Sequence, residues 1–182
     1  MNNQSKFDKD KFHRQSWSQI AKDPKAWLCY AENLKHAADI LRDNCWPRQR
    51  KSDDLIAARN DLFYGPVYML LSGLAIETLI KGIMVAIDPH LIEQQKQNAK
   101  ITGHKLVELF RETEITECKN DTDLLSRLQN YVENFGRYPV TILKQNMAKR
   151  ANTRFCRVDL DKVDRLWKRL LGKIQQYTTE DE

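Results

Sequence analysis

The chain has 182 residues, of which 41% are hydrophobic and 30% are charged, with only six glycines and five prolines. This composition excludes collagen-like and linker-dominated chains and predicts one globular domain with a buried core. The net charge of +5 is uneven, because residues 137–176 contain 11 Lys and Arg against 3 Asp and Glu, whereas residues 53–136 contain 8 against 13. The basic C-terminal part favours a nucleic-acid or acidic protein partner, with a solvated basic helix and loop as the alternative.

Cysteine spacing and the amino-terminal residues bear on the compartment. Cys29, Cys45, Cys118 and Cys156 are far apart and form no Cys-x-x-Cys pair, so we interpret them as reduced thiols rather than zinc ligands. The first 16 residues contain no apolar stretch typical of a signal peptide. No metal-binding or glycine-rich phosphate motif is found. We therefore expect a cytoplasmic protein without a metal or cofactor.

The first predicted helix begins at Asp23-Pro24, a pair typical of an N-cap followed by the first helical residue. It extends to about Asn44, because apolar residues recur at helical spacing as far as that point. These residues are Trp27, Ala31, Leu34, Ala38 and Leu41. A polar loop follows, and then a short helix is predicted over residues 55–63.

The longest apolar segment, residues 67–87, is predicted to be the central helix. Pro66 can begin it, and Asp88 ends it because the residue before a proline is displaced from helical geometry. The segment is long enough to cross a bilayer, but Glu77 and Lys81 would each cost roughly 2.5–3.5 kcal/mol near the membrane centre. We therefore predict a buried core helix, and no membrane partner.

Glu77 and Lys81 are four residues apart, with the acid on the N-terminal side, which is the favourable order for a helical ion pair. Two interpretations are open. The pair lies at the rim of the helix, facing water or a dimer partner, or it lines a polar pocket between helices.

Three more helices are predicted, over residues 104–112, 121–135 and from about Asp159 to 177, with Gly136 as the C-terminal cap of the second. Their inward-facing residues are Leu106, Leu109 and Phe110, then Leu124, Leu125, Leu128, Tyr131, Val132 and Phe135, and finally Leu160, Val163, Leu166 or Trp167, Leu170, Ile174 and Tyr177. The pattern predicts an all-α, up-and-down helical bundle of about five helices. We place an extension at residues 1–22, one bundle domain at 23–177 and an acidic tail at 178–182.

Three segments together resemble the HEPN domain family. Ala75–Gly82 (AIETLIKG) resembles the family's A-x-E-x-x-x-K helix, and Thr102–Leu109 (TGHKLVEL) resembles its H-D-L-x-x-L segment. Leu128–Val132 (LQNYV), followed by Gly136–Pro139 (GRYP), resembles its tyrosine and R-Y-P segment. The order and spacing are similar over roughly residues 20–176.

This resemblance implies a HEPN-like helical bundle that is usually dimeric. Many members are metal-independent RNA endonucleases of toxin–antitoxin or phage-defence systems, and others are partners of nucleotidyltransferases or RNA-binding modules. The nuclease members carry an Arg followed about four to six residues later by a His. Neither Arg127 nor Arg137 is followed by a histidine here. The resemblance therefore implies RNA binding without the usual nuclease motif, and leaves enzymatic activity, a ribonuclease if any, open.

The candidate RNA-binding residues are cations for phosphate contacts and aromatic rings for base stacking. They are Arg137, Tyr138, Lys144, Lys149, Arg150, Arg154 and Arg157, with Phe155 as a second ring. The alternative for Arg137-Tyr138-Pro139 is a helix stop whose tyrosine packs on the core.

Metal-free RNA cleavage requires a base of near-neutral pKa and a cation that stabilises the phosphorane. His104 and Arg137 suit these roles, with Glu77 beside them as a third candidate catalytic residue. The alternative for His104 is an N-terminal cap, or a hydrogen bond that fixes the loop before it. A buried structural pair is equally open to Glu77 and Arg137.

The expected partners are a second copy of the chain, RNA, and a nucleotidyltransferase-like or antitoxin protein. A non-enzymatic interaction module is the alternative to RNA binding. That alternative predicts an apolar dimer face on the first and fourth helices.

Overall fold

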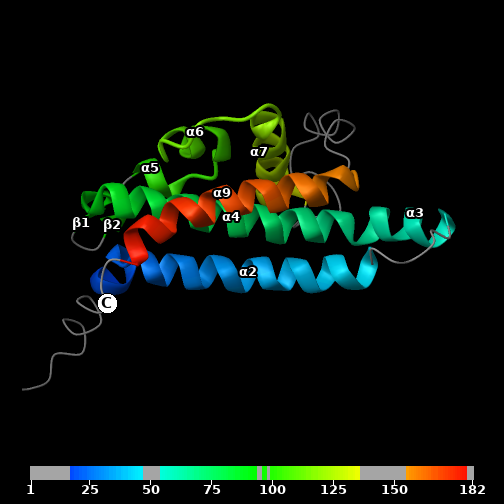
Figure 1. Cartoon of the computed structure of the whole chain (residues 1–182), viewed down its shortest axis with the longest axis horizontal. Coiled ribbons are helices and arrows are strands. Elements are labelled where there is room, and N and C mark those ends of the chain that lie inside the picture. The colour runs from blue at the N-terminus through cyan, green and yellow to red at the C-terminus, as the bar shows by residue number, and fades with distance from the viewer. Residues whose placement is uncertain (1–16, 47–53, 94–95, 98, 136–154, 180–182) are drawn as a thin grey trace, which may run out of the picture.

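The computed structural model describes residues 17–46, 54–93, 96–97, 99–135 and 155–179. These form an all-α bundle around one long helix, α4 (Gly65–Ile87). Helix α2 (Pro24–Cys45) lies antiparallel to α4 on one side, and α9 (Val158–Thr178) runs along α4 in the same direction as α4 (Figure 1). The predicted all-α bundle is therefore confirmed.

Helix α2 begins where its cap residue predicts. The Asp23 carboxylate accepts a hydrogen bond from the backbone N–H of Lys25 at 2.9 Å, and Pro24 occupies the first turn. Ala31 and Ala38 are fully buried against α4. A helical segment over residues 17–22 precedes α2 and is joined to it by a hydrogen bond from Trp27 Nε1 to the Ala21 carbonyl oxygen at 2.8 Å.

Helix α4 is the core of the bundle. It follows α3 (Asp54–Phe63) after one intervening residue, Tyr64, and 15 of its 23 residues are buried. Its length and composition alone would allow it to cross a membrane, but 67% of its most apolar 18-residue window is buried inside the fold. This burial is consistent with the core helix of a soluble bundle.

The described residues between α4 and α6 form several short elements. These are the 3-10 helix η1 (Pro89–Leu91), the two-residue antiparallel strands β1 (Ile92–Glu93) and β2 (Lys96–Gln97), and the one-turn helix α5 (Ala99–Thr102). The small strand pair is a feature that the sequence did not predict. Helix α6 (Leu106–Arg111) follows, so the helix predicted over 104–112 starts later and leaves His104 in the link before it.

Helix α7 (Asp121–Asn130) continues into a π-helical turn, η2 (Tyr131–Phe135). The predicted inward residues of this helix are buried where the structure describes their side chains. They are Leu124, Leu125, Leu128, Tyr131 and Val132. Gly136, the predicted cap, lies outside the described residues.

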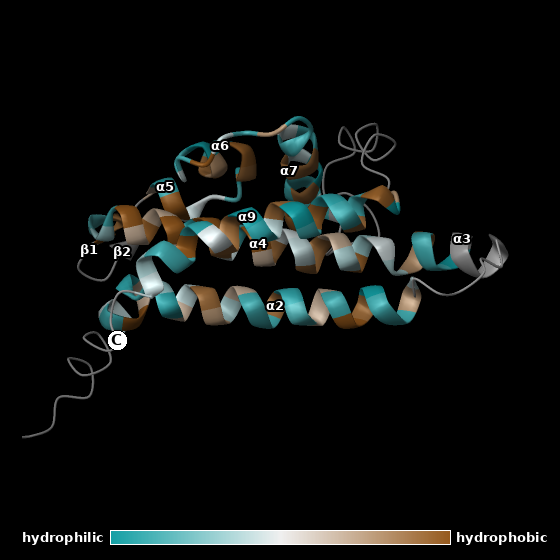
Figure 2. Cartoon of the chain, in the orientation of Figure 1, coloured by the Kyte–Doolittle hydropathy of each residue, from teal (hydrophilic) through white to brown (hydrophobic). Residues whose placement is uncertain are grey.

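Figure 2 shows apolar and polar turns alternating along α2, as expected for an amphipathic helix.

Helix α9 covers α4 with a strongly amphipathic face. Five of its predicted inward residues are buried: Val163, Leu166, Trp167, Leu170 and Ile174. The prediction for Tyr177 was wrong, since this side chain is 37% exposed and Lys173 Nζ lies 5.7 Å from its ring centroid. Tyr177 is in the last turn, beyond the part of α9 that packs on α4, and helical spacing alone does not show where such packing ends.

Candidate functional site

Glu77 and Lys81 form a buried ion pair on α4. Lys81 Nζ donates to Glu77 Oε1 at 2.6 Å, and the two side chains are only 11% and 7% exposed. The pair therefore does not lie at a solvent-exposed rim. Burial of two charges is costly unless the charges are paired and hydrogen-bonded, so the structure must supply further partners for the carboxylate.

His104 supplies the second partner of the Glu77 carboxylate. His104 Nδ1 lies 2.9 Å from Oε1 and 3.0 Å from Oε2, across a separation of 27 residues. The imidazole is 43% exposed, whereas the carboxylate is buried. Because an ionised carboxylate only accepts hydrogen bonds, Nδ1 carries the proton in this contact. The contact fixes the link between α5 and α6 onto α4.

This arrangement leaves one imidazole nitrogen available. Within the described ranges, Nε2 of His104 has no hydrogen-bond partner. A buried carboxylate that orients an imidazole while its other nitrogen remains accessible is a standard arrangement for general acid–base catalysis. The same geometry is equally suited to holding a loop in place. Glu77, Lys81 and His104, which we call the polar cluster, could therefore serve catalysis or fix the α5–α6 link.

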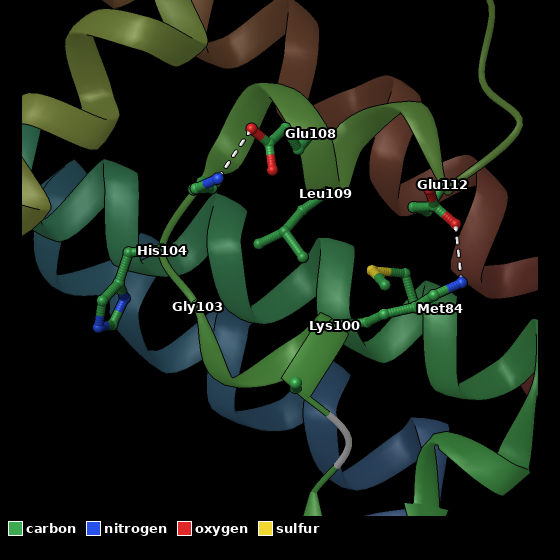
Figure 3. Close-up of a pocket in the computed structure, with 9 residues that line it drawn as sticks. Met84, Lys100, Gly103, His104, Glu108, Leu109 and Glu112 are labelled. Atoms are coloured by element: carbon green, nitrogen blue, oxygen red, sulfur yellow. Dashed lines mark hydrogen bonds and ion pairs between the residues drawn. The ribbon is translucent and has the colours of Figure 1, made fainter.

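A cavity of about 490 Å³ lies next to His104, between the α5–α6 segment and the end of α4. Met84 and Leu109 line it, whereas the ring of His104 is turned away from them (Figure 3). Its charged side chains pair with each other, Lys105 with Glu108 at 3.1 Å and Lys100 with Glu112 at 3.9 Å. Neither Glu77 nor Lys81 lines this cavity. The polar cluster therefore lies beside the cavity, and His104 is the member of the cluster that lines it.

The candidate RNA-binding residues fall mostly outside the described ranges. Those residues are Arg137, Tyr138, Lys144, Lys149, Arg150 and Arg154. Arg157 is described, is exposed, and lies with Nε 3.5 Å from Asp61 Oδ1.

Phe155 is buried, so its prediction as a stacking ring for RNA bases was wrong. It is 4% exposed, its ring centroid lies 4.9 Å from that of Trp46 and 6.0 Å from that of Tyr68, and it packs over Gly65. An aromatic residue in a basic segment suggested a stacking surface, but here the ring is part of the core. Phe155 is therefore not available for base stacking.

One buried ion pair escaped the sequence analysis. Arg127 on α7 makes two hydrogen bonds with Asp159 at the start of α9, at 2.7 and 2.6 Å, and Asp159 is fully buried. These hydrogen bonds raise the pKa of the Arg127 guanidinium above its ordinary value, against the opposing effect of burial. The sequence signal was an arginine between Leu124 and Leu128 on an otherwise apolar face. Asp159 was interpreted only as a dipole-stabilising residue, because its partner is 32 positions away.

Comparisons of the chain with family models, with curated proteins and with solved structures found no match. The functional interpretation therefore depends on the residues of the chain and on their geometry.

Proposed function

We propose that this protein is a HEPN-like, RNA-associated domain of the bacterial toxin–antitoxin or phage-defence type, acting in the cytoplasm. The observation that supports the proposal most is the meeting of Glu77, Lys81 and His104 in one cluster. Two segments that resemble HEPN motifs contribute these side chains to a single hydrogen-bonded site, in which His104 lies 27 positions after Glu77. Separate chance matches would not be expected to converge in this way.

RNA binding is assigned to the basic part of the chain that begins at Arg137. Phosphate contacts come from Arg137, Lys144, Lys149, Arg150, Arg154 and Arg157, and Tyr138 provides a ring for stacking. Residues 137–176 carry eight more positive than negative charges. Charge of this density attracts a polyanion independently of sequence.

The test is binding of fluorescent single-stranded RNA to the full chain over a series of salt concentrations. We expect affinity to fall with salt, and the variant Lys149→Ala/Arg150→Ala to bind more weakly with a shallower salt dependence. Lys22→Ala/Lys25→Ala removes the same charge from exposed positions near the start of α2 and should bind as the wild type does. Absence of binding by the wild type would overturn the proposal.

A second candidate function is metal-independent RNA cleavage. The observation that favours it is the exposed imidazole of His104, oriented by the buried carboxylate of Glu77. In this function His104 acts as the base toward the 2′-hydroxyl, and Arg137 stabilises charge on the phosphorane.

Cleavage is tested by incubating the protein with labelled RNA and tRNA in the presence of EDTA. Activity lost in both His104→Ala and Arg137→Ala but retained in His90→Ala, an exposed histidine at the other end of the same segment, would establish this function. Intact RNA with a salt-sensitive mobility shift would leave RNA binding alone.

We also propose that the protein is a homodimer, as the HEPN resemblance implies. A groove of about 520 Å³ lies between the 17–22 segment, α2 and α4, and it is lined by apolar side chains such as Ile20 and Tyr30, which are 62% and 72% exposed. The exposed positions of α7 are polar, so this groove is the better candidate for the apolar face than one that includes the fourth helix. Light scattering of the wild type and of Ile20→Lys tests it: a wild-type monomer overturns the dimer.

The alternative proposal is a non-enzymatic interaction module, in which the same groove binds a nucleotidyltransferase-like or antitoxin protein. A wild type that is dimeric and binds no RNA would favour it.

A further inference from the structure

A small hollow between α9 and the turn before α7 is lined largely by cations. Its volume is about 110 Å³, and its charged lining consists of Lys119, Lys162, Arg165, Arg169 and Asp121. The four cations come from two segments more than 40 residues apart in the sequence. None of them belongs to the candidate residues discussed above.

The helical spacing of α9 explains why three of these cations converge. Lys162, Arg165 and Arg169 are separated by three and four residues, so they occupy one face of the helix. Leu166 and Leu170 border this face and are buried against the core. The cationic face is therefore turned outward where α9 passes the start of α7.

Asp121 holds one of the cations in position. Its Oδ2 accepts from Arg169 Nη1 at 2.6 Å and from the backbone N–H of Cys118 at 2.8 Å, and its side chain is 11% exposed. Arg169 also donates through Nη2 to the carbonyl oxygen of Thr116. The guanidinium is thus fixed at the wall of the hollow, and the only carboxylate in the lining is already engaged.

Two of the remaining cations lack a counter-charge in the part of the chain that the structure describes. Within the described ranges, Lys119 and Arg165 make no ion pair. Lys162 lies 4.0 Å from Asp159, whose carboxylate is held by Arg127. The hollow therefore presents several positive donors, and the carboxylate in its lining is already engaged, a composition that suits an oxyanion.

We propose that this hollow binds a phosphate group of the RNA backbone. The inference rests on the proposed RNA-binding function and adds to it a defined contact point on α9. Pockets for whole small molecules occupy about 300–1,000 Å³, so this hollow is suited to a single phosphate and not to a nucleotide. Arg157, a candidate RNA-binding residue, directly precedes α9 and comes five positions before Lys162.

Two experiments on the full chain test the site. In the first, single-stranded RNA is titrated against the wild type, Lys162→Ala/Arg165→Ala and the control Lys22→Ala/Lys25→Ala at the start of α2, an end of the bundle away from α7 (Figure 1). Loss of one phosphate contact should reduce the slope of log K against log salt by about 0.7 in the first variant only. In the second, inorganic phosphate is titrated while the NMR signals of the Lys119–Asp121 amides and of Arg165 Nε–H are followed.

The outcomes separate the two proposals. RNA binding with the reduced slope supports the site as an RNA contact. RNA binding that is unchanged in Lys162→Ala/Arg165→Ala overturns the site as an RNA contact and leaves the proposed function standing. If the wild type binds no RNA, the proposed function fails, and saturable phosphate shifts at Lys119 and Arg165 then assign the hollow to free phosphate. No shifts there overturn the site altogether.

Discussion

Glu77 connects the candidate site, because its carboxylate contacts both Lys81 and His104. It accepts hydrogen bonds from Lys81 and His104, and it is nearly inaccessible to water. An ion pair in such a place adds little net stability compared with apolar residues, but loss of one member leaves the other charge uncompensated. Stability measurements therefore report directly on whether this geometry is present in solution.

We expect Glu77→Gln to destabilise the fold by about 3 kcal/mol, because it leaves the Lys81 ammonium buried without a counter-charge. Urea unfolding followed by circular dichroism measures the change. Glu108→Gln is the control, since its ion pair with Lys105 is exposed and should contribute less than about 1 kcal/mol. Equal effects of the two substitutions would contradict the buried geometry.

The double variant Glu77→Gln/Lys81→Met separates charge burial from packing. It removes the uncompensated ammonium, so we expect it to recover part of the stability that Glu77→Gln loses. A double variant that is less stable than Glu77→Gln would show that Lys81 stabilises the fold through contacts other than the pair.

Tyr68 provides a test at alkaline pH. Its hydroxyl is buried and, within the described residues, has no hydrogen-bond partner of ordinary geometry. Burial raises the pKa of Tyr68, and the neighbouring Ser72 hydroxyl offsets only part of this effect. The folded protein therefore keeps the phenol proton at a pH where the unfolded chain loses it, so stability falls as pH rises above about 10.

We expect Tyr68→Phe to be neutral or to stabilise the fold by about 1 kcal/mol at pH 8, since it removes an unsatisfied buried polar group. The gain should grow between pH 9 and pH 11, because only the wild type carries the Tyr68 titration. Urea midpoints at these pH values measure it. A variant that is less stable than the wild type by more than about 1 kcal/mol would mean that the hydroxyl is hydrogen-bonded.

At the scale of the elements, the contact between α2 and α4 depends on Gly82. A Cβ atom at this position would lie 2.6 Å from Trp27 Cβ and 3.0 Å from Ile174 Cδ1. The absence of a side chain therefore lets α2 and α9 both approach α4 closely. Gly82 therefore allows close helix packing in the same segment, AIETLIKG, that carries the Glu77–Lys81 ion pair.

We expect Gly82→Ala to destabilise the bundle by about 1–3 kcal/mol, because the added methyl group overpacks a filled interface. Gly172→Ala on α9 is the matched control, since nothing lies within 4 Å of the Cβ that it would add. In that exposed helical position alanine should stabilise by roughly 0.5–1 kcal/mol. Thermal unfolding compares the two, and opposite signs are the expected result.

At the scale of the whole molecule, an ion-pair network closes the bundle between its first and last long helices. Asp164 on α9 accepts from Lys35 Nζ at 3.0 Å and from Arg42 Nη1 at 2.9 Å, both on α2. Asp39 joins the same network from α2. The network holds α9 against α2, so that the two helices cover α4 together.

We expect Asp164→Asn to cost about 1–2 kcal/mol, between the values for exposed and buried pairs, because these side chains are partly exposed. Part of the loss should disappear at 1 M salt, where charges are screened in the wild type. Asp161→Asn is the control, since within the described ranges Asp161 makes no ion pair. Hydrogen exchange of α9 amides locates the effect, and equal behaviour of the two variants would contradict a closing role.

The sequence alone determined the helical class, the core helix and most buried positions, because apolar periodicity and local signals such as Asp23-Pro24 act within one helix. The spacing of Glu77 and Lys81 indicated one ion pair within a helix, but which charges from different elements meet depends on the tertiary structure. The contacts of His104 with Glu77, of Arg127 with Asp159 and of Asp164 with Lys35 join residues 27 to 129 positions apart. Side-chain pattern fixes the face on which a charge lies, but its partner depends on how separate helices pack, and helix packing is set by the whole core.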